Sequence, residues 1–149
     1  MGTIRLPQDF KEFLKLLNEH EVRYLIIGGY AVAYYGYPRA ANDLGSWIEK
    51  EPQNAEKLIQ VLKRFGFDDN EMKPEMFLKK DQTIRIGHPP IRIELLTSIS
   101  GVQFQPCFDS RTADSIDGIE MQIMGLKELK TNKKASGRHI DLHDVEHLP

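Results

Sequence analysis

The chain has 149 residues, enough for one domain with its own core and too few for two, so we expect a single domain over residues 1–149. Its hydrophobic content of 40% and charged content of 28% are typical of a globular protein. The net charge of −2 and the pI of about 6.2 exclude a global basic field. A polyanionic partner would therefore have to use a local patch.

Targeting and redox signals are sparse. The single Cys107 excludes an intramolecular disulfide and suits a reducing compartment. Residues 1–6 are not followed by a long apolar core, so the sequence predicts no signal peptide. No apolar stretch approaches the roughly 20 residues that a membrane span needs. We therefore expect a cytoplasmic protein without a membrane partner.

The first elements are a helix and a buried strand. The segment between Asp9 and His20 predicts an amphipathic helix, because its apolar residues recur at helical spacing and Asp9 and Glu12 form a capping box. Residues 24–27 are continuously apolar, which is typical of a strand buried on both faces. Gly28-Gly29 ends this strand.

The rest of the chain also alternates helix and strand signals. A short helix is predicted at 30–35. Further helices are predicted at 52–65 with Gly66 as C-cap, at 126–136 before Gly137, and at 140–147. Strands are predicted at 43–48, 76–79, 83–86, 91–96 and 120–124, with a turn at 88–90. This order predicts an α+β fold with a mixed sheet and helices packed on it.

Two carboxylates stand in strand-like surroundings. Residues i and i+2 of a strand point to the same face, so an Asp-x-Asp pair can hold two divalent cations against a triphosphate, and an acid on a neighbouring strand completes the set. Asp43 supplies the first position and Glu94, within Ile-Arg-Ile-Glu-Leu-Leu, the third. The alternatives are that Asp43 merely begins a strand and that Glu94 faces solvent or pairs with Arg85 or Arg92.

Gly28-Gly29 also has two interpretations. Glycines at a strand-to-helix turn let backbone amides approach a phosphate, helped by the helix that follows. The alternative is a tight turn that needs only the conformations of glycine. The pair alone does not choose between them.

Together these motifs resemble the nucleotidyltransferase superfamily with the DNA polymerase β-like fold, and most of all its small bacterial members, which include toxin and abortive-infection types. The matching segments lie between about Val22 and Glu146. They are Ile-Gly-Gly at 27–29, Tyr-Tyr-Gly-Tyr-Pro-Arg at 34–39, Asp-Leu-Gly at 43–45, Ile-Glu-Leu at 93–95, Leu-Leu-Thr-Ser-Ile-Ser-Gly-Val at 95–102, Asn-Lys-Lys-Ala-Ser-Gly-Arg at 132–138 and Asp-Leu-His-Asp-Val-Glu at 141–146. The resemblance implies a nucleotidyltransferase-like mixed sheet, magnesium, a nucleoside triphosphate and transfer of a nucleotidyl group to an acceptor.

The sequence departs from that pattern at three positions. Gly45 stands where the family has its second carboxylate, and Ser46 occupies a position that is normally apolar. Ile140 replaces the lysine that many relatives place before the aspartate. The remaining ligands, Asp43 and Glu94, could hold one weak magnesium ion but hardly two. We therefore expect the family's activity to be impaired.

Cationic and imidazole side chains complete the candidates. Arg39, between the glycines and Asp43, could contact a phosphate or form a surface salt bridge. Lys133 falls on the inward stripe of its helix, and with the resemblance counted we favour a role at the triphosphate over an outward position. The stripe of His139, His143 and His147 favours a solvated surface over a metal site. Asp141 and Asp144 could orient basic site residues or cap the preceding helix.

The leading hypothesis is nucleotidyl transfer from a nucleoside triphosphate to an unknown acceptor. Asp43 would be a metal ligand and Glu94 a metal ligand and base for the acceptor hydroxyl. Phosphates would be held by Gly28, Gly29, Arg39 and Lys133. The alternative is a non-catalytic nucleotide-binding or protein-interaction domain. An antitoxin-like protein partner, or an RNA or protein acceptor, would be the expected macromolecular partner.

Overall fold

A computed structural model describes residues 4–37, 43–67, 70, 72–88 and 91–149. The helices are α1 (Gln8–Glu19), α2 (Gly28–Tyr34), α3 (Pro52–Arg64), α4 (Phe104–Asp109), α5 (Leu126–Ser136) and α6 (His139–His147), with a short 3₁₀ helix, η1 (Pro74–Phe77). The strands are β1 (Tyr24–Ile27), β2 (Asp43–Ile48), β3 (Thr83–His88), β4 (Ile91–Leu96), β5 (Thr112–Ile116) and β6 (Ile119–Ile123).

Within these ranges the strands form one six-stranded sheet in the order β3-β4-β2-β1-β6-β5. The pairs β2/β4 and β1/β6 are parallel, while β1/β2, β3/β4 and β5/β6 are antiparallel. The chain enters β4 only after passing through α3, η1 and β3, which is the long connection that a parallel pair requires. The predicted α+β fold with a mixed sheet is confirmed.

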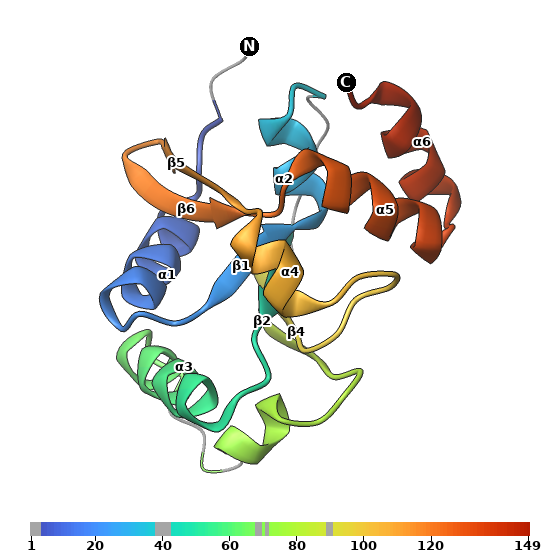
Figure 1. Cartoon of the computed structure of the whole chain (residues 1–149). Helices are drawn as coiled ribbons and strands as arrows, with labels where there is room; N and C mark the ends of the chain where they lie inside the picture. Colours follow the sequence, from blue (N-terminus) through green and yellow to red (C-terminus); the bar gives the residue numbers. More distant parts are fainter. Residues whose placement is uncertain (1–3, 38–42, 68–69, 71, 89–90) are drawn as a thin grey trace.

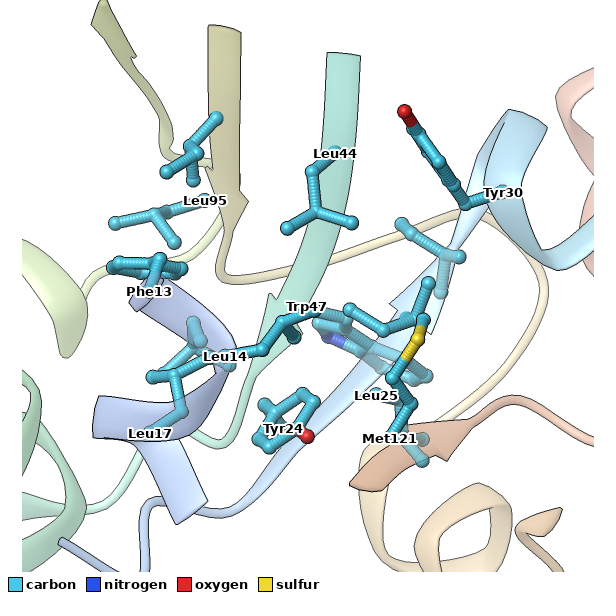
Figure 2. Close-up of a cluster of buried hydrophobic side chains, with 14 of the residues drawn as sticks. Phe13, Leu14, Leu17, Tyr24, Leu25, Tyr30, Leu44, Trp47, Leu95 and Met121 are labelled. Carbon is cyan, nitrogen blue, oxygen red and sulfur yellow. The ribbon is translucent and has the colours of Figure 1, made fainter. Parts of the chain in front are cut away.

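Helices α1 and α3 cover one face of the sheet, and α4, α5 and α6 lie on the other side of the central strands (Figure 1). The apolar stripe of α1 is fully buried, as its spacing predicts: Phe10, Phe13, Leu14 and Leu17. These side chains pack with Leu44 and Leu95 of the sheet in one apolar cluster (Figure 2). Burial of this cluster is the main source of stability on this face.

Alternation along β2 divides its side chains between the two faces. Leu44, Ser46 and Ile48 point to the α1/α3 core, and all three are buried. Trp47 points the other way and meets the ring of Phe104 of α4 edge-on, with the ring centroids 5.1 Å apart. The face that carries Trp47 also carries Asp43 and Gly45, at the end of the strand away from α4.

Some local predictions were wrong. Residues 76–79 do not form a strand: η1 begins at Pro74, whose fixed φ suits the first turn of a helix, and buries Phe77. The capping box of α1 is absent, since Pro7 is the N-cap and no side chain bonds to that cap. The turn predicted at 88–90 falls partly outside the described residues. Gly137 does end α5, with a left-handed φ of 69°.

No helix in the described part of the chain is long and apolar enough to cross a membrane.

Candidate functional site

Asp43, Gly45 and Glu94 lie together on one face of the sheet. In the parallel pairing of β2 with β4, Asp43 is opposite Arg92 and Gly45 is opposite Glu94. Residues in register and residues two apart in a strand share a face, so the two acids do as well. One strand spacing of about 4.8 Å and two residues of rise separate their Cα atoms by roughly 8 Å. The predicted juxtaposition of the two acids is therefore present.

The glycines stand at the same end of the sheet. Ile27, the last residue of β1, is in register with Gly45 on β2, and the chain then enters α2 through Gly28 and Gly29. Gly28 has a φ of +70°, a conformation that other residues rarely adopt. The positive φ of Gly28 is by itself a reason for glycine at this turn. The turn also lies beside the two acids, which is where a phosphate-binding loop would have to lie.

Each acid is held by an arginine. Arg92 donates two hydrogen bonds to Asp43, from Nε to Oδ1 at 3.2 Å and from a terminal nitrogen to Oδ2 at 2.8 Å. Arg85 donates from Nε to Oε2 of Glu94 at 3.0 Å. The bonds to Asp43 raise the pKa of Arg92 above its ordinary value. The pairing with Arg85 was one alternative from the sequence, and the fork between Arg92 and Asp43 was not foreseen.

Lys133 is buried in an ion-pair network between α5 and α6. Its Nζ lies 3.3 Å from Oδ1 of Asp141 and 2.9 Å from Oδ2 of Asp144, and all three side chains are at most 5% exposed. Arg138 donates a further bond to Asp141, at 2.7 Å. Asp141 and Asp144 therefore orient cationic residues, which was one of the two roles left open for them.

The same network sets the charge state of Asp141. Burial raises the pKa of this carboxyl, but hydrogen bonds from Arg138 and Ser136 and the charge of Lys133 outweigh burial and lower the pKa from 3.8 to about 2. Asp141 is therefore ionised throughout the physiological range. It carries a fixed negative charge that keeps Lys133 and Arg138 in place.

These groups surround one cavity of about 730 Å³. Its walls come from the end of β1, the Asp43 end of β2, strands β3 and β4, the loop after β4, and helices α5 and α6. The lining residues are Ile27, Gly28, Gly29, Asp43, Gly45, Thr83, Arg85, Arg92, Glu94, Leu96, Ser98, Ile99, Ser100, Asn132, Lys133, Ser136, Arg138 and Asp141. A cavity of this size falls within the range of small-molecule sites.

Every predicted site residue that the structure describes lies in this cavity, whereas Arg39 lies outside the described residues. Sequence reasoning missed Asn132, Arg138 and the serines of the loop after β4. Arg138 follows Gly137, the residue that ends α5, and it lines the cavity together with residues of the sheet. A positively charged residue directly after the glycine that ends a helix was the sequence feature that could have indicated Arg138.

The histidine stripe of α6 lies apart from the cavity. His143 and His147 are exposed and contact Tyr37, whose hydroxyl lies 2.8 Å from Nε2 of His143 and whose ring stacks on His147. Neither histidine lines the cavity. The surface position favoured from the sequence is the one observed.

The described part of the cavity offers few of the oxygen ligands that a magnesium ion needs. Among the residues that the structure describes, no group of three or more His, Cys, Asp or Glu side chains is arranged to hold a metal ion. Asp43 and Glu94 offer the hard oxygen ligands that magnesium prefers. Both are engaged by guanidinium groups, and Gly45, opposite Glu94, contributes no side-chain ligand.

No family model matches the sequence, and no curated protein matches it. Solved structures do share its fold. A lincosamide antibiotic adenylyltransferase, LnuA, solved with lincomycin bound, is 12% identical with a TM-score of 0.56, and the match covers 97% of this chain and 96% of that one. An antigenic nucleotidyltransferase-like protein from Paracoccidioides brasiliensis is 17% identical with a TM-score of 0.54, covering 95% and 76%.

A presumed nucleotidyltransferase from Thermotoga maritima is 14% identical with a TM-score of 0.57, covering 93% of this chain and 84% of that one. Identities this low establish the fold alone. The chain thus has the nucleotidyltransferase fold, and the resemblance seen in its motifs is confirmed at that level.

Proposed function

We propose that this protein binds a nucleoside triphosphate in the cavity beside Gly28-Gly29, and that its ancestral reaction is magnesium-dependent nucleotidyl transfer, impaired by Gly45. The observation that carries the proposal is the placement of Asp43 and Glu94. They lie on neighbouring parallel strands, on one face, in the cavity of a fold shared with nucleotidyltransferases.

In the ancestral reaction an acceptor hydroxyl attacks the α-phosphorus of the nucleotide, the bond to the β-phosphate oxygen breaks, and pyrophosphate leaves. Glu94 would take the proton of the hydroxyl. In this chain, where Gly45 lacks a carboxylate, Asp43 and Glu94 would hold at most a single magnesium ion, whose chemistry is to offset the charge of the phosphates. Gly28, Gly29 and Lys133 would position the phosphates, and Arg39 is proposed for the same role from sequence alone.

Impairment follows from the number of ligands. A two-ion displacement needs carboxylates to place both cations, and here two acids remain, each bonded to an arginine. Defects in residues that only support metal ligands typically cost about 10–100-fold in metal affinity or activity, and a missing ligand should cost more. We therefore expect binding of nucleotide with little or no transfer.

The test separates binding from transfer. Calorimetry with each of the four ribonucleoside triphosphates in magnesium buffer should detect weak binding, at up to millimolar nucleotide. Incubation of the protein with α-labelled nucleotide and cell extract should give little label in RNA or protein. Absence of binding to all four nucleotides would refute the proposal, and robust transfer would refute the impairment.

A non-catalytic role is the second candidate, favoured by the arginine pairs on both acids. In that case the cavity serves as a nucleotide sensor, or the fold presents a surface to an antitoxin-like protein. Co-purification of the tagged protein with a small partner would support the interaction role. Nucleotide binding unaffected by Asp43→Asn would separate sensing from metal-dependent chemistry.

A further inference from the structure

The carboxylates of the cavity are matched by guanidinium groups on the same sheet face. Arg92 is in register with Asp43 across β2/β4, and Arg85 is in register with Glu94 across β3/β4. Both arginines line the cavity, with side chains that are 30% and 54% exposed respectively. Their position is fixed by strand register, so the two cations face the space in which a ligand would sit.

The hydrogen bonds to the two acids leave part of each guanidinium group available. A guanidinium carries five N–H donors. Arg85 reaches Glu94 through Nε, and Arg92 reaches Asp43 through Nε and one terminal nitrogen. The carboxylates thus orient the two guanidinium groups, and the remaining N–H groups can donate hydrogen bonds to a further anion. Arginine suits this arrangement because its planar fork binds carboxylate and phosphate with the same geometry.

A divalent ion meets competition at these acids. Both oxygens of Asp43 accept from the fork of Arg92, and Oε2 of Glu94 accepts from Arg85, so an ion at either acid would share the carboxylate with a guanidinium group. Gly45 stands between them without a carboxylate that could recruit the ion independently. The positive charges beside these two acids are therefore supplied by the protein itself, through Arg85 and Arg92.

From this geometry we infer that the cavity binds the polyphosphate of its nucleotide through Arg85 and Arg92 without a divalent cation. The inference rests on the proposed function, because it takes the cavity to be the nucleotide site. It adds the mode of recognition: two arginines oriented by Asp43 and Glu94 act as the anion ligands. The two acids serve here as positioning residues rather than as metal ligands.

The test uses inorganic tripolyphosphate, which contains the triphosphate chain common to all nucleoside triphosphates but has no sugar or base. Binding is measured by calorimetry at fixed ionic strength, once with EDTA and once with magnesium, and repeated with ATP, GTP, CTP and UTP. The expected result is binding in EDTA. Arg92→Gln and Arg85→Gln should each weaken it by about tenfold or more, since hydrogen bonds to charged groups are strong.

Two further variants keep the test interpretable. Arg92→Lys retains the charge but loses the fork, and it should bind with intermediate affinity. Arg64→Gln removes an exposed arginine of α3, outside the cavity, and should bind like the wild type. Thermal unfolding of each variant establishes that the fold is intact. An equal loss in Arg64→Gln would show non-specific attraction and overturn the inference.

The remaining outcomes separate this inference from the proposed function. Nucleotide binding that needs magnesium and is unchanged in Arg85→Gln and Arg92→Gln would overturn the inference and leave the proposed function standing. No binding of any nucleotide, with or without magnesium, would overturn both.

Discussion

The Nζ of Lys133 lies 2.9 Å from Oδ2 of Asp144, and both side chains are withdrawn from solvent. Lys133 is thus an internal counterion in the wall of the cavity, whatever it also contributes to a phosphate. A buried pair of this kind gives little net stability by itself, but loss of one partner leaves an uncompensated charge. The wall of the cavity therefore depends on a charge balance that single substitutions should upset.

Lys133→Met is expected to lower the free energy of unfolding by on the order of 3–5 kcal/mol. Asp141 keeps the bond from Arg138 in this variant, so the loss comes from removing the charge that Lys133 places between the two aspartates. Urea denaturation measures the change. Lys134→Met, at an exposed position of the same helix, is the matched control and should stay within about 0.5 kcal/mol. Equal stability of the two variants would contradict the counterion role.

Acid should weaken the same network in a defined range. The pKa of Asp141 is lowered from 3.8 to about 2 in the folded protein. A lowered folded-state pKa contributes stability that is present above the unfolded value and is lost as the pH falls from about 4 toward about 2. Urea unfolding between pH 2 and 6 should show this loss. The Asp141→Asn variant should be less stable than the wild type at neutral pH, and its free energy of unfolding should change less between pH 2 and 6. If the free energy of unfolding fell equally with pH in both proteins, Asp141 would not be the group responsible.

Ser46 offers a stabilising substitution. Its side chain is fully buried on the core face of β2, and its Oγ has no hydrogen-bond partner among the described residues. A buried hydroxyl without a partner costs free energy, so Ser46→Ala should raise the free energy of unfolding by about 1 kcal/mol. Ser115→Ala, at an exposed position of β5, should leave stability unchanged. A less stable Ser46→Ala would mean that the hydroxyl has a partner in solution.

Much of the fold was predictable because its signals are local. The continuous apolar run of β1 and the helical spacing of Phe10, Phe13, Leu14 and Leu17 each report burial directly. Two missed elements lack such a signal. β5 reads Thr-Ala-Asp-Ser-Ile and lies at the sheet edge, where polar residues are tolerated. α4 has six residues, too short to show a helical period.

The gathering of the two acids and the glycines at one end of the sheet was predictable, but the complete lining of the cavity and most of its ion pairs were not. Motif order was enough to bring Asp43, Glu94 and the glycines together. The fork between Arg92 and Asp43 depends on the register of two parallel strands that are far apart in sequence. No local pattern encodes that register. For Lys133 the inward position was predictable, and Asp141 and Asp144 were candidates to orient a basic residue, but the sequence did not decide between that role and helix capping.

Gly45→Asp is expected to restore magnesium-dependent transfer if the rest of the site is intact. Gly45 has no positive φ, so an ordinary residue can adopt its backbone. An added Cβ would lie 3.3 Å from Cγ1 of Ile27, which must yield by a few tenths of an ångström. The new carboxylate would stand two residues from Asp43 on the same face and opposite Glu94, so three acids would lie together on this face of the sheet.

The measurement compares labelled-nucleotide transfer in cell extract for the wild type, Gly45→Asp, Gly45→Asn and Gly45→Asp with Asp43→Ala. The Asn variant has nearly the same shape without the charge, so it separates metal ligation from a packing effect. Transfer should increase in Gly45→Asp alone and disappear again in the double variant. If Gly45→Asp stays inactive while it folds and binds nucleotide, Ser46, Ile140 or the arginine pairs have committed the cavity to binding. Robust transfer by the unmodified protein would instead require another group to serve as the second metal ligand.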